Sequence, residues 1–294
     1  MSKFLEILKT RTMICDGAMG TQLMEAGMQP GECSESWNLE HADKVMAIQK
    51  AYIDAGADIV ITNTFGGNRW VLQRHGRAGD LEMLNTSAVE IARKAAGNGN
   101  FVAGDIGPTG ELPQPYGLRS EEEFVQVFAE QSKALAKAGI DVIFIETQTA
   151  NEELGAAVRA AKENTDLPIC ASASYSPGAK ADDYRTMMGA TVETMVEAAL
   201  SNGADIVGAN CGAVDMRDMV SIVKKVRKIT DKFILIEANA GKPVVEGTRT
   251  TYPQTPEEFA EHVQALIDAG ANIIGGCCGT TPQHIAAIAG IVKG

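Results

Sequence analysis

The chain has 294 residues, of which 45% are hydrophobic and 22% are charged, the balance of an ordinary globular protein. Its formal net charge of −12 excludes functions that depend on a basic surface, so we expect neither nucleic acid nor a membrane as a partner. No apolar run approaches the about 20 residues that span a bilayer, and the charged N-terminal stretch is unlike a signal peptide. These features predict a cytoplasmic protein with room for one large barrel or two small domains.

A short pattern recurs four times along the chain, around Gly56, Gly139, Gly203 and Gly270. In each case an alanine-rich amphipathic stretch precedes the glycine, and a β-branched apolar run follows it. A glycine suits the left-handed position that closes a helix. The apolar run is typical of a strand buried on both faces of a parallel sheet. The repeating unit is therefore helix, glycine turn and strand.

Eight strands alternate with helices when the gaps between these repeats are filled. The predicted strands lie near residues 12–16, 58–63, 101–105, 141–146, 168–173, 205–210, 233–238 and 272–276. The predicted helices cover residues 41–55, 80–96, 121–138, 151–164, 190–202, 214–228, 256–269 and 282–292. This alternation predicts an α/β fold, one closed (β/α)8 TIM barrel over residues 1–294. The alternative is a doubly wound open sheet, but no Gly-x-Gly-x-x-Gly follows the first strand, which counts against a dinucleotide-binding domain.

Three longer connections, 24–40, 106–120 and 239–255, follow the first, third and seventh strands. In a barrel, such loops build the active site at the C-terminal ends of the strands. Polar or thiol side chains end these apolar strands, and we expect them to meet in one pocket. They are Asp16, Thr62, Asn63, Asp105, Glu146, Ser172, Asn210, Cys211, Glu237, Asn239, Cys277 and Cys278.

Three of the six cysteines end strands on the same rim: Cys211 ends the sixth strand, and Cys277 and Cys278 end the eighth. At about 4.8 Å between neighbouring strands, the ends of the sixth and eighth strands are about 10 Å apart. The curvature of the barrel and the length of the side chains then bring the sulfur atoms closer together. Three thiolates can then surround one zinc ion at about 2.3 Å each. Adjacent residues of a regular strand point to opposite faces. Both neighbours can therefore bind one ion only if the backbone turns, which the flanking glycines permit.

Such a site is typical of catalytic zinc, because three protein ligands leave one tetrahedral position open. A substrate thiol entering that position is deprotonated by the metal, and its sulfur suits attack on an activated methyl group. The alternative is that a cysteine at a strand end is simply a small buried residue. We adopt that alternative for Cys15, Cys33 and Cys170, and we expect no disulfide framework in a cytoplasmic protein.

The segments at the strand ends resemble the homocysteine S-methyltransferase family, and most closely the homocysteine-binding barrel of cobalamin-dependent methionine synthases. The matching segments are residues 16–21, 62–65, 104–108, 145–147, 210–211 and 275–282. They extend over nearly the whole chain, and together they are highly specific although each alone is modest. The resemblance implies a TIM-barrel methyltransferase that forms methionine from homocysteine.

The resemblance implies that Cys211, Cys277 and Cys278 hold the zinc ion and are the catalytic residues. The homocysteine sulfur would attack the donor methyl group directly, in line with its leaving group, without a general base. Asn239 resembles a position whose side chain can occupy the fourth zinc site before the substrate arrives. The alternative for Asn239 is an asparagine that caps a loop.

The resemblance also implies a binding site for L-homocysteine. Asp16 and Glu146 would hold its α-ammonium group in a charge-assisted arrangement. Alternatively, Asp16 caps the turn before Gly17. Backbone amides near Gly17 and Ser172 would bind the substrate carboxylate, and Asn63 belongs to the same substrate-binding set.

The methyl donor depends on the type of family member. Gly279 and the segment 237–243 resemble the cobalamin-dependent type, which implies methylcobalamin as the donor. Because the chain has one barrel and no cobalamin domain, we expect the corrinoid to arrive on a separate protein or domain. The alternatives are betaine or S-methylmethionine as donor, or a non-catalytic module that binds zinc or thiols. A lyase or aldolase would need a lysine for a Schiff base, and no predicted strand ends in one.

Overall fold

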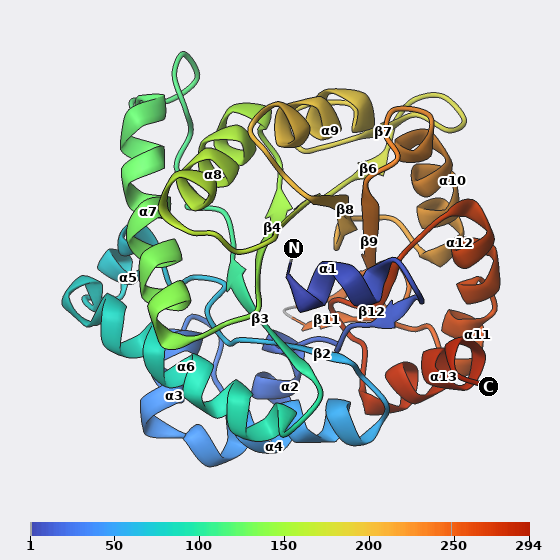
Figure 1. Cartoon of the computed structure of the whole chain (residues 1–294), viewed down its shortest axis with the longest axis horizontal. Helices are drawn as coiled ribbons and strands as arrows, with labels where there is room; N and C mark the ends of the chain where they lie inside the picture. Colours follow the sequence, from blue (N-terminus) through green and yellow to red (C-terminus); the bar gives the residue numbers. More distant parts are fainter. Residues whose placement is uncertain (1, 248) are drawn as a thin grey trace.

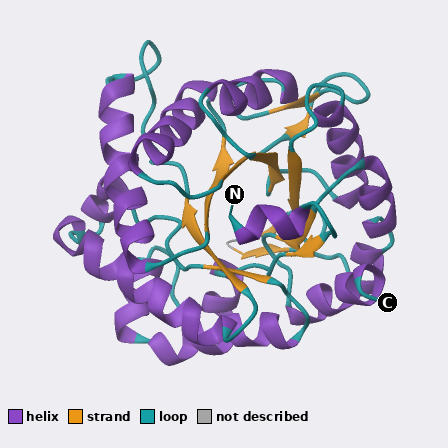
Figure 2. Cartoon of the chain, viewed as in Figure 1, coloured by secondary structure: helices purple, strands orange, loops and turns teal. Residues whose placement is uncertain are grey.

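Eight parallel strands form one sheet that curves round into a barrel, and helices surround it (Figures 1 and 2). The computed structural model describes residues 2–247 and 249–294. The barrel strands are β1 (Met13–Ile14), β2 (Ile59–Ile61), β3 (Phe101–Ile106), β4 (Val142–Gln148), β5 (Ile169–Ala173), β8 (Ile206–Asn210), β9 (Phe233–Ala238) and β12 (Ile273–Gly276). Their order in the sheet is β1-β12-β9-β8-β5-β4-β3-β2. A parallel bridge between Cys15 and Ile59 closes the ring, which confirms the predicted barrel.

The helices outside the barrel follow the predicted alternation. They are α4 (Ala42–Asp54), α6 (Leu81–Ala96), α7 (Glu121–Ala138), α8 (Asn151–Asn164), α9 (Val192–Ser201), α10 (Met216–Arg227), α11 (Pro256–Ala260), α12 (Val263–Ala269) and α13 (Pro282–Val292). Capping boxes begin α7 at Ser120 and α10 at Asp215. Left-handed glycines end α7 at Gly139 and α12 at Gly270, as the repeat predicted.

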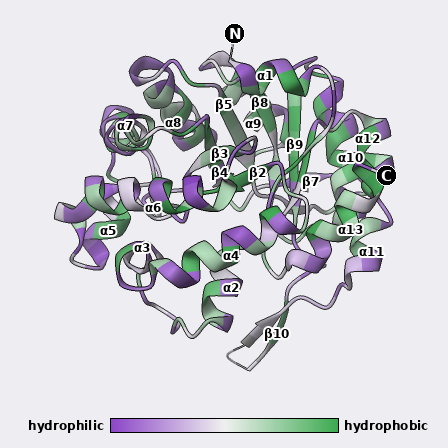
Figure 3. Cartoon of the chain, turned by 60° about the horizontal axis from the view of Figure 1, so that its bottom comes forward, coloured by the Kyte–Doolittle hydropathy of each residue, from purple (hydrophilic) through white to green (hydrophobic). Residues whose placement is uncertain are grey.

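Two layers of apolar side chains hold the barrel together. The interior layer includes Cys15, Phe144 and Cys170, and the short helix α1 (Lys3–Leu8) seals the N-terminal end with Phe4 and Leu8. Figure 1 shows α1 lying across this end of the barrel. The larger layer fills the space between sheet and helices, and hydrophobic strands are enclosed by helices with hydrophilic outer faces (Figure 3). All three cysteines expected to be small buried residues are buried.

Several short elements lie in segments that were expected to be irregular. Residues 24–40 include part of α2 (Gly20–Glu25), the 3-10 helix η1 (Ser34–Ser36) and α3 (Trp37–Glu40). The segment 239–255 contains a hairpin of β10 (Val244–Glu246) and β11 (Arg249–Thr251), which projects from the body of the protein (Figure 3). Such short elements depend on tertiary contacts and have no clear periodicity.

The remaining elements are also short. They are α5 (Arg69–Arg74), the 3-10 helix η2 (Ala78–Asp80), and the hairpin of β6 (Ser176–Pro177) and β7 (Tyr184–Arg185). The helix predicted over residues 256–269 is divided into α11 and α12 by a turn at Glu261 and His262. Within the described part of the chain, no helix combines the length and the apolar character needed to cross a membrane.

Candidate active site

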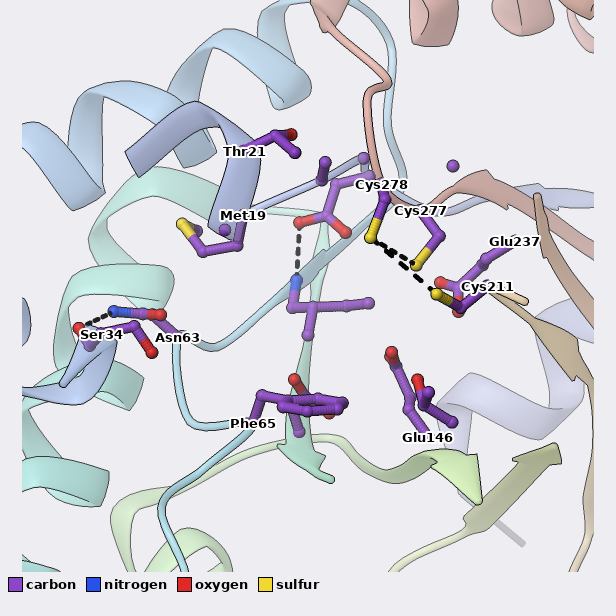
Figure 4. Close-up of a pocket in the computed structure, with 18 of the residues that line it drawn as sticks. Met19, Thr21, Ser34, Asn63, Phe65, Glu146, Cys211, Glu237, Cys277 and Cys278 are labelled. Carbon is purple, nitrogen blue, oxygen red and sulfur yellow. Dashed lines mark hydrogen bonds between the residues drawn. The ribbon is translucent and has the colours of Figure 1, made fainter. Parts of the chain in front are cut away.

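A cavity of about 260 Å³ opens at the C-terminal ends of the barrel strands (Figure 4). Its walls come from the ends of β1, β2, β3, β4, β8, β9 and β12 and from the residues that follow them. Segments from both ends of the chain therefore meet here, as expected for loops on the C-terminal face of a barrel. The described lining includes three cysteines and four carboxylic acids but no lysine, arginine or histidine.

The sulfur atoms of Cys211, Cys277 and Cys278 point toward one another on one wall of the cavity (Figure 4). The Sγ atoms of Cys211 and Cys278 are 3.9 Å apart, and those of Cys277 and Cys278 are 4.0 Å apart. All three sulfurs lie within 4.8 Å of one another. Tetrahedral zinc–thiolate bonds of about 2.3 Å separate neighbouring sulfurs by about 3.8 Å. The spacing and the all-thiolate donor set therefore suit a zinc ion.

Backbone turns bring these cysteines together. Cys211 follows β8 with φ of 57°, and Gly212 follows with φ of 79°, so two consecutive left-handed residues turn the chain at the strand end. Cys277 donates its amide N–H to the carbonyl oxygen of Ala238 at 2.7 Å, which extends the pairing of β12 with β9. Gly279, with φ of 79°, then turns the chain. This turn lets adjacent cysteines face one point.

One of the three thiols is poised to ionise. Hydrogen bonds from the Cys211 and Cys277 thiols lower the pKa of Cys278, and they outweigh the opposing effect of burial. The Cys277 thiol donates to the Cys278 sulfur in the structure. A thiolate held by two neighbouring thiols is ready to bind a metal ion, which then displaces the remaining thiol protons.

Asp16 and Glu146 line the same cavity and are both more than 90% buried. Asp16 accepts a hydrogen bond from the Ile61 amide at 2.8 Å, and Glu146 accepts one from the Asn210 amide group at 3.2 Å. Burial raises the pKa of Asp16. Burial, with the Cys278 thiolate nearby, raises the pKa of Glu146 to about 7. Because Oε1 of Glu146 has no hydrogen-bond partner among the described residues, the pair suits a cationic group in the cavity.

Asp105 and Glu237 are two further acidic residues of the lining to which the sequence assigned no role. Both are buried, and within the described part of the chain Oδ1 of Asp105 and both carboxyl oxygens of Glu237 lack a hydrogen-bond partner. Burial, followed by the charge of Glu146, raises the pKa of each. Their signal in the sequence was the same as that of Glu146, a carboxylate that ends an apolar strand.

Gly17 and Asn63 also lie in the cavity wall, as expected. A Cβ atom added to Gly17 would lie 2.7 Å from the ring of Tyr52, so this position admits only a glycine. The side-chain amide of Asn63 donates to the carbonyl oxygen of Ser34 at 2.7 Å (Figure 4). Asn63 thereby ties the loop after β1 to the end of β2.

Ser172 and Asn239 are each 1% exposed and lie behind the cavity wall. The Ser172 hydroxyl donates to Oδ1 of Asn210 at 2.8 Å, and Asn210 in turn donates to Glu146. The Asn239 side chain donates to the carbonyl oxygen of Gly212 at 2.8 Å, and its Oδ1 has no hydrogen-bond partner in the part of the chain that the structure describes. The geometry thus connects Ser172 to the support of Glu146, and Asn239 to the turn that follows Cys211.

The chain matches known proteins over nearly its whole length. Residues 13–292 match the family model described as homocysteine S-methyltransferase. Methionine synthases of Mycobacterium leprae and Mycobacterium tuberculosis are each 30% identical over 308 residues, covering 98% of this chain. The chain spans only 25% of the length of each of these relatives.

A solved structure has the same fold. The metallated form of the homocysteine methyltransferase MmuM from Escherichia coli superposes with a TM-score of 0.80 at 22% identity. The superposition covers 97% of this chain and 98% of that protein. The family match extends over nearly all of the barrel and includes every strand that lines the cavity. The chain therefore belongs to the homocysteine S-methyltransferase family.

Proposed function

We propose that this chain, acting as one barrel domain over residues 1–294, transfers a methyl group to the sulfur of L-homocysteine and so forms methionine. The observation that carries the proposal is the set of three cysteine sulfurs, at spacings of 3.9 and 4.0 Å, beside buried carboxylates in one cavity. A thiol of an amino acid needs both a sulfur site and an ammonium site. The family match supports the same reaction.

Cys211, Cys277 and Cys278 would hold zinc, which would supply a thiolate form of the substrate at its fourth position. Asp16 and Glu146 would bind the α-ammonium group, with Asn210 keeping Glu146 in place. These residues would fix both ends of the substrate, so that its sulfur faces the open rim for in-line attack on the methyl donor.

The remaining expected residues would complete the substrate site. Backbone amides near Gly17 would receive the carboxylate, and Asn63 would shape the wall beside it. Ser172 would act through Asn210 rather than by direct contact. The Asn239 side chain would reach the fourth zinc position only if its hydrogen bond to the carbonyl oxygen of Gly212 were broken.

We propose methylcobalamin, carried on a separate protein or domain, as the methyl donor. A cavity of about 260 Å³ is below the about 300–1,000 Å³ of pockets that enclose drug-sized ligands, so a large donor must approach from outside. The rim loops also expose large apolar side chains, which are typical of a protein-binding surface. They are Phe65, Leu112, Tyr116, Leu118, Met187, Met188, Val244 and Val245.

A second candidate is a small donor whose methyl group lies on a positively charged nitrogen or sulfur, betaine or S-methylmethionine. The described cavity lining has four carboxylic acids and no basic side chain, which favours a donor with a positive charge. Such a donor would need no protein carrier. The two candidates therefore differ in whether a free small molecule sustains the reaction.

The test combines zinc analysis with methyl transfer in the wild type, Cys277→Ala and Cys33→Ala. Cys33 is the matched control, because it is buried outside the cavity. Free methylcobalamin, betaine and S-methylmethionine are offered separately. We expect about one zinc per chain and methionine formation, both lost in Cys277→Ala and kept in Cys33→Ala. Circular dichroism checks that each variant is folded.

Each outcome separates the candidates. Turnover with methylcobalamin alone supports the corrinoid donor, and turnover with betaine or S-methylmethionine supports the second candidate. If zinc binds but no free donor supports turnover, a methylated corrinoid protein is the next donor to be offered. If that donor fails too, the chain is a non-catalytic module that binds zinc or thiols. Wild-type protein without zinc, or a fully active Cys277→Ala variant, would overturn the proposal.

A further inference from the structure

Tyr252 lies outside the cavity lining but packs against the chain immediately after the cysteine pair. It follows β11, at the base of the hairpin in the segment 239–255. A Cβ atom added to Gly279 would meet Cβ and Cγ of Tyr252, and would lie 2.6 Å from Cδ2 of its ring. The tyrosine therefore occupies the space beside residue 279, next to Cys278.

Backbone hydrogen bonds hold Tyr252 in this position. The Gln254 amide donates to the carbonyl oxygen of Ala240 at 3.0 Å, and the Ala240 amide donates to the carbonyl oxygen of Cys278 at 3.0 Å. A ring nitrogen of His284 lies 3.0 Å from the carbonyl oxygen of Gln254. The segment that carries Tyr252 is thus joined to the backbone of Cys278 through a single intermediate residue.

The site has an excess of negative charge that Tyr252 can reduce. Three cysteines, which would be thiolates around zinc, and four carboxylic acids face one cavity, and the described lining includes no basic side chain. A phenol with an ordinary pKa of about 10 is a donor at neutral pH. The hydroxyl of Tyr252 can therefore donate a hydrogen bond to an anionic sulfur.

We propose that Tyr252 is a positioning residue whose hydroxyl donates a hydrogen bond to the thiolate of Cys278 and whose ring shields that sulfur from water. This inference rests on the proposed function, because it concerns the zinc-loaded site. Hydrogen bonds to ionised acceptors are short and strong. By withdrawing charge from one ligand sulfur, the tyrosine would make the metal a better acceptor for the homocysteine thiolate.

The test replaces zinc with Co²⁺, whose thiolate-to-metal charge-transfer band reports the electron density on the ligand sulfurs without turnover. In Tyr252→Phe the ring remains and the hydroxyl is lost, so we expect the band to move to lower energy. We also expect homocysteine to bind about tenfold more weakly, the lower end of effects for outer-shell partners of metal ligands. Tyr184→Phe is the matched control, since the Tyr184 hydroxyl donates to Asp218 at 3.2 Å and Tyr184 lies outside the cavity lining.

The outcomes separate this inference from the proposed function. A shifted band and weaker homocysteine binding in Tyr252→Phe, with neither change in Tyr184→Phe, support the role of the hydroxyl. An unchanged band and unchanged homocysteine affinity in Tyr252→Phe overturn it, while the wild-type charge-transfer band still supports the three-thiolate site. A wild-type protein that shows no thiolate-to-cobalt band overturns both proposals.

Discussion

At the scale of single residues, buried carboxylic acids dominate the electrostatics of the cavity. Asp16, Asp105, Glu146 and Glu237 are each more than 90% buried, and burial raises the pKa of all four. Glu237 is the extreme case, because it is 1% exposed and neither oxygen has a hydrogen-bond partner in residues 2–247 and 249–294. Ionised carboxylates in such surroundings cost stability unless a cation is bound, which suits residues kept for a ligand.

We predict that Glu237→Gln stabilises the metal-free protein at high pH. The folded-state pKa of Glu237 is raised above its ordinary 4.5, so its favourable contribution is complete below that value and is lost as the pH rises through the folded pKa. The neutral glutamine does not ionise. Urea unfolding should show the variant about 1–3 kcal/mol more stable than wild type at pH 8, with little difference near pH 4.5.

The control for this prediction is Glu261→Gln, an exposed position between α11 and α12. Because such a surface substitution changes stability by less than about 0.5 kcal/mol, the Glu261→Gln protein should be about as stable as the wild type. Equal differences between Glu237→Gln and wild type at both pH values would contradict the argument from burial.

At the scale of an element, the end of β8 is the most constrained part of the site. Cys211 is a non-glycine residue at φ of 57°, a conformation that costs about 1–2 kcal/mol. Gly212 follows at φ of 79°, and a Cβ atom there would meet the carbonyl oxygen of Tyr175. The turn therefore depends on a glycine to aim the Cys211 sulfur at its two partners.

We predict that Gly212→Ala destabilises the protein by about 2–4 kcal/mol and lowers its zinc content below that of wild type. Gly189→Ala is the matched control, because Gly189 has φ of 83° but no atom within 4 Å of an added Cβ. It should lose only about 1 kcal/mol, with zinc content unchanged. Thermal unfolding and metal analysis measure both effects. Similar losses of zinc in the two variants would show that backbone strain, not the clash at Tyr175, governs the site.

At the scale of the whole molecule, the barrel closes between its first two strands, where the pairing is shortest. β1 has two residues, and a single bridge connects it to β2. Asp58 supports this junction by accepting hydrogen bonds from the Ile14 amide at 2.9 Å, from Arg11 at 2.8 and 3.0 Å, and from Lys293 at 2.9 Å. One carboxylate thus links the chain's first strand, its second strand and its C-terminal region.

We predict that Asp58→Asn lowers the free energy of unfolding by about 1–2 kcal/mol at pH 7. The expected loss is this small because Arg11 and Lys293 are partly exposed, so solvent screens their charges. Although burial opposes ionisation, hydrogen bonds from Arg11 and Lys293 lower the pKa of Asp58. Its contribution is therefore present above the ordinary 3.8 and is lost as the pH falls through the folded pKa. Urea unfolding should show the two proteins converging in stability at acid pH.

Asp54→Asn provides the comparison, because Asp54 pairs with Lys50 where both side chains are at least 60% exposed. That change should alter stability by less than about 0.5 kcal/mol. Methyl transfer per folded molecule should be unchanged in both variants, since Asp58 lies at the end of the barrel opposite the cavity. A loss of activity in folded Asp58→Asn would contradict this division between the two ends.

The sequence by itself determined the barrel and the rim on which its chemistry lies. The hydrophobic periodicity of strands and helices, together with glycines at helix ends such as Gly139, specifies how strands and helices alternate along the chain. These signals are readable in the sequence because they depend on local backbone geometry and burial. Position at a strand end was also enough to identify Cys211, Cys277, Cys278 and Glu146 as neighbours, because parallel strands end on one face.

Only the tertiary structure decided which contacts each side chain at that rim makes. Ser172 donates a hydrogen bond to Asn210 behind the wall, while Glu237 faces the cavity with no hydrogen-bond partner among the described residues. Tyr252 lies against Gly279 because the segment after β9 folds back over the end of β12. The local pattern fixes which face a strand residue occupies. The path of a long loop depends on contacts between residues far apart in sequence. The same contacts decide which polar groups are left without a hydrogen bond.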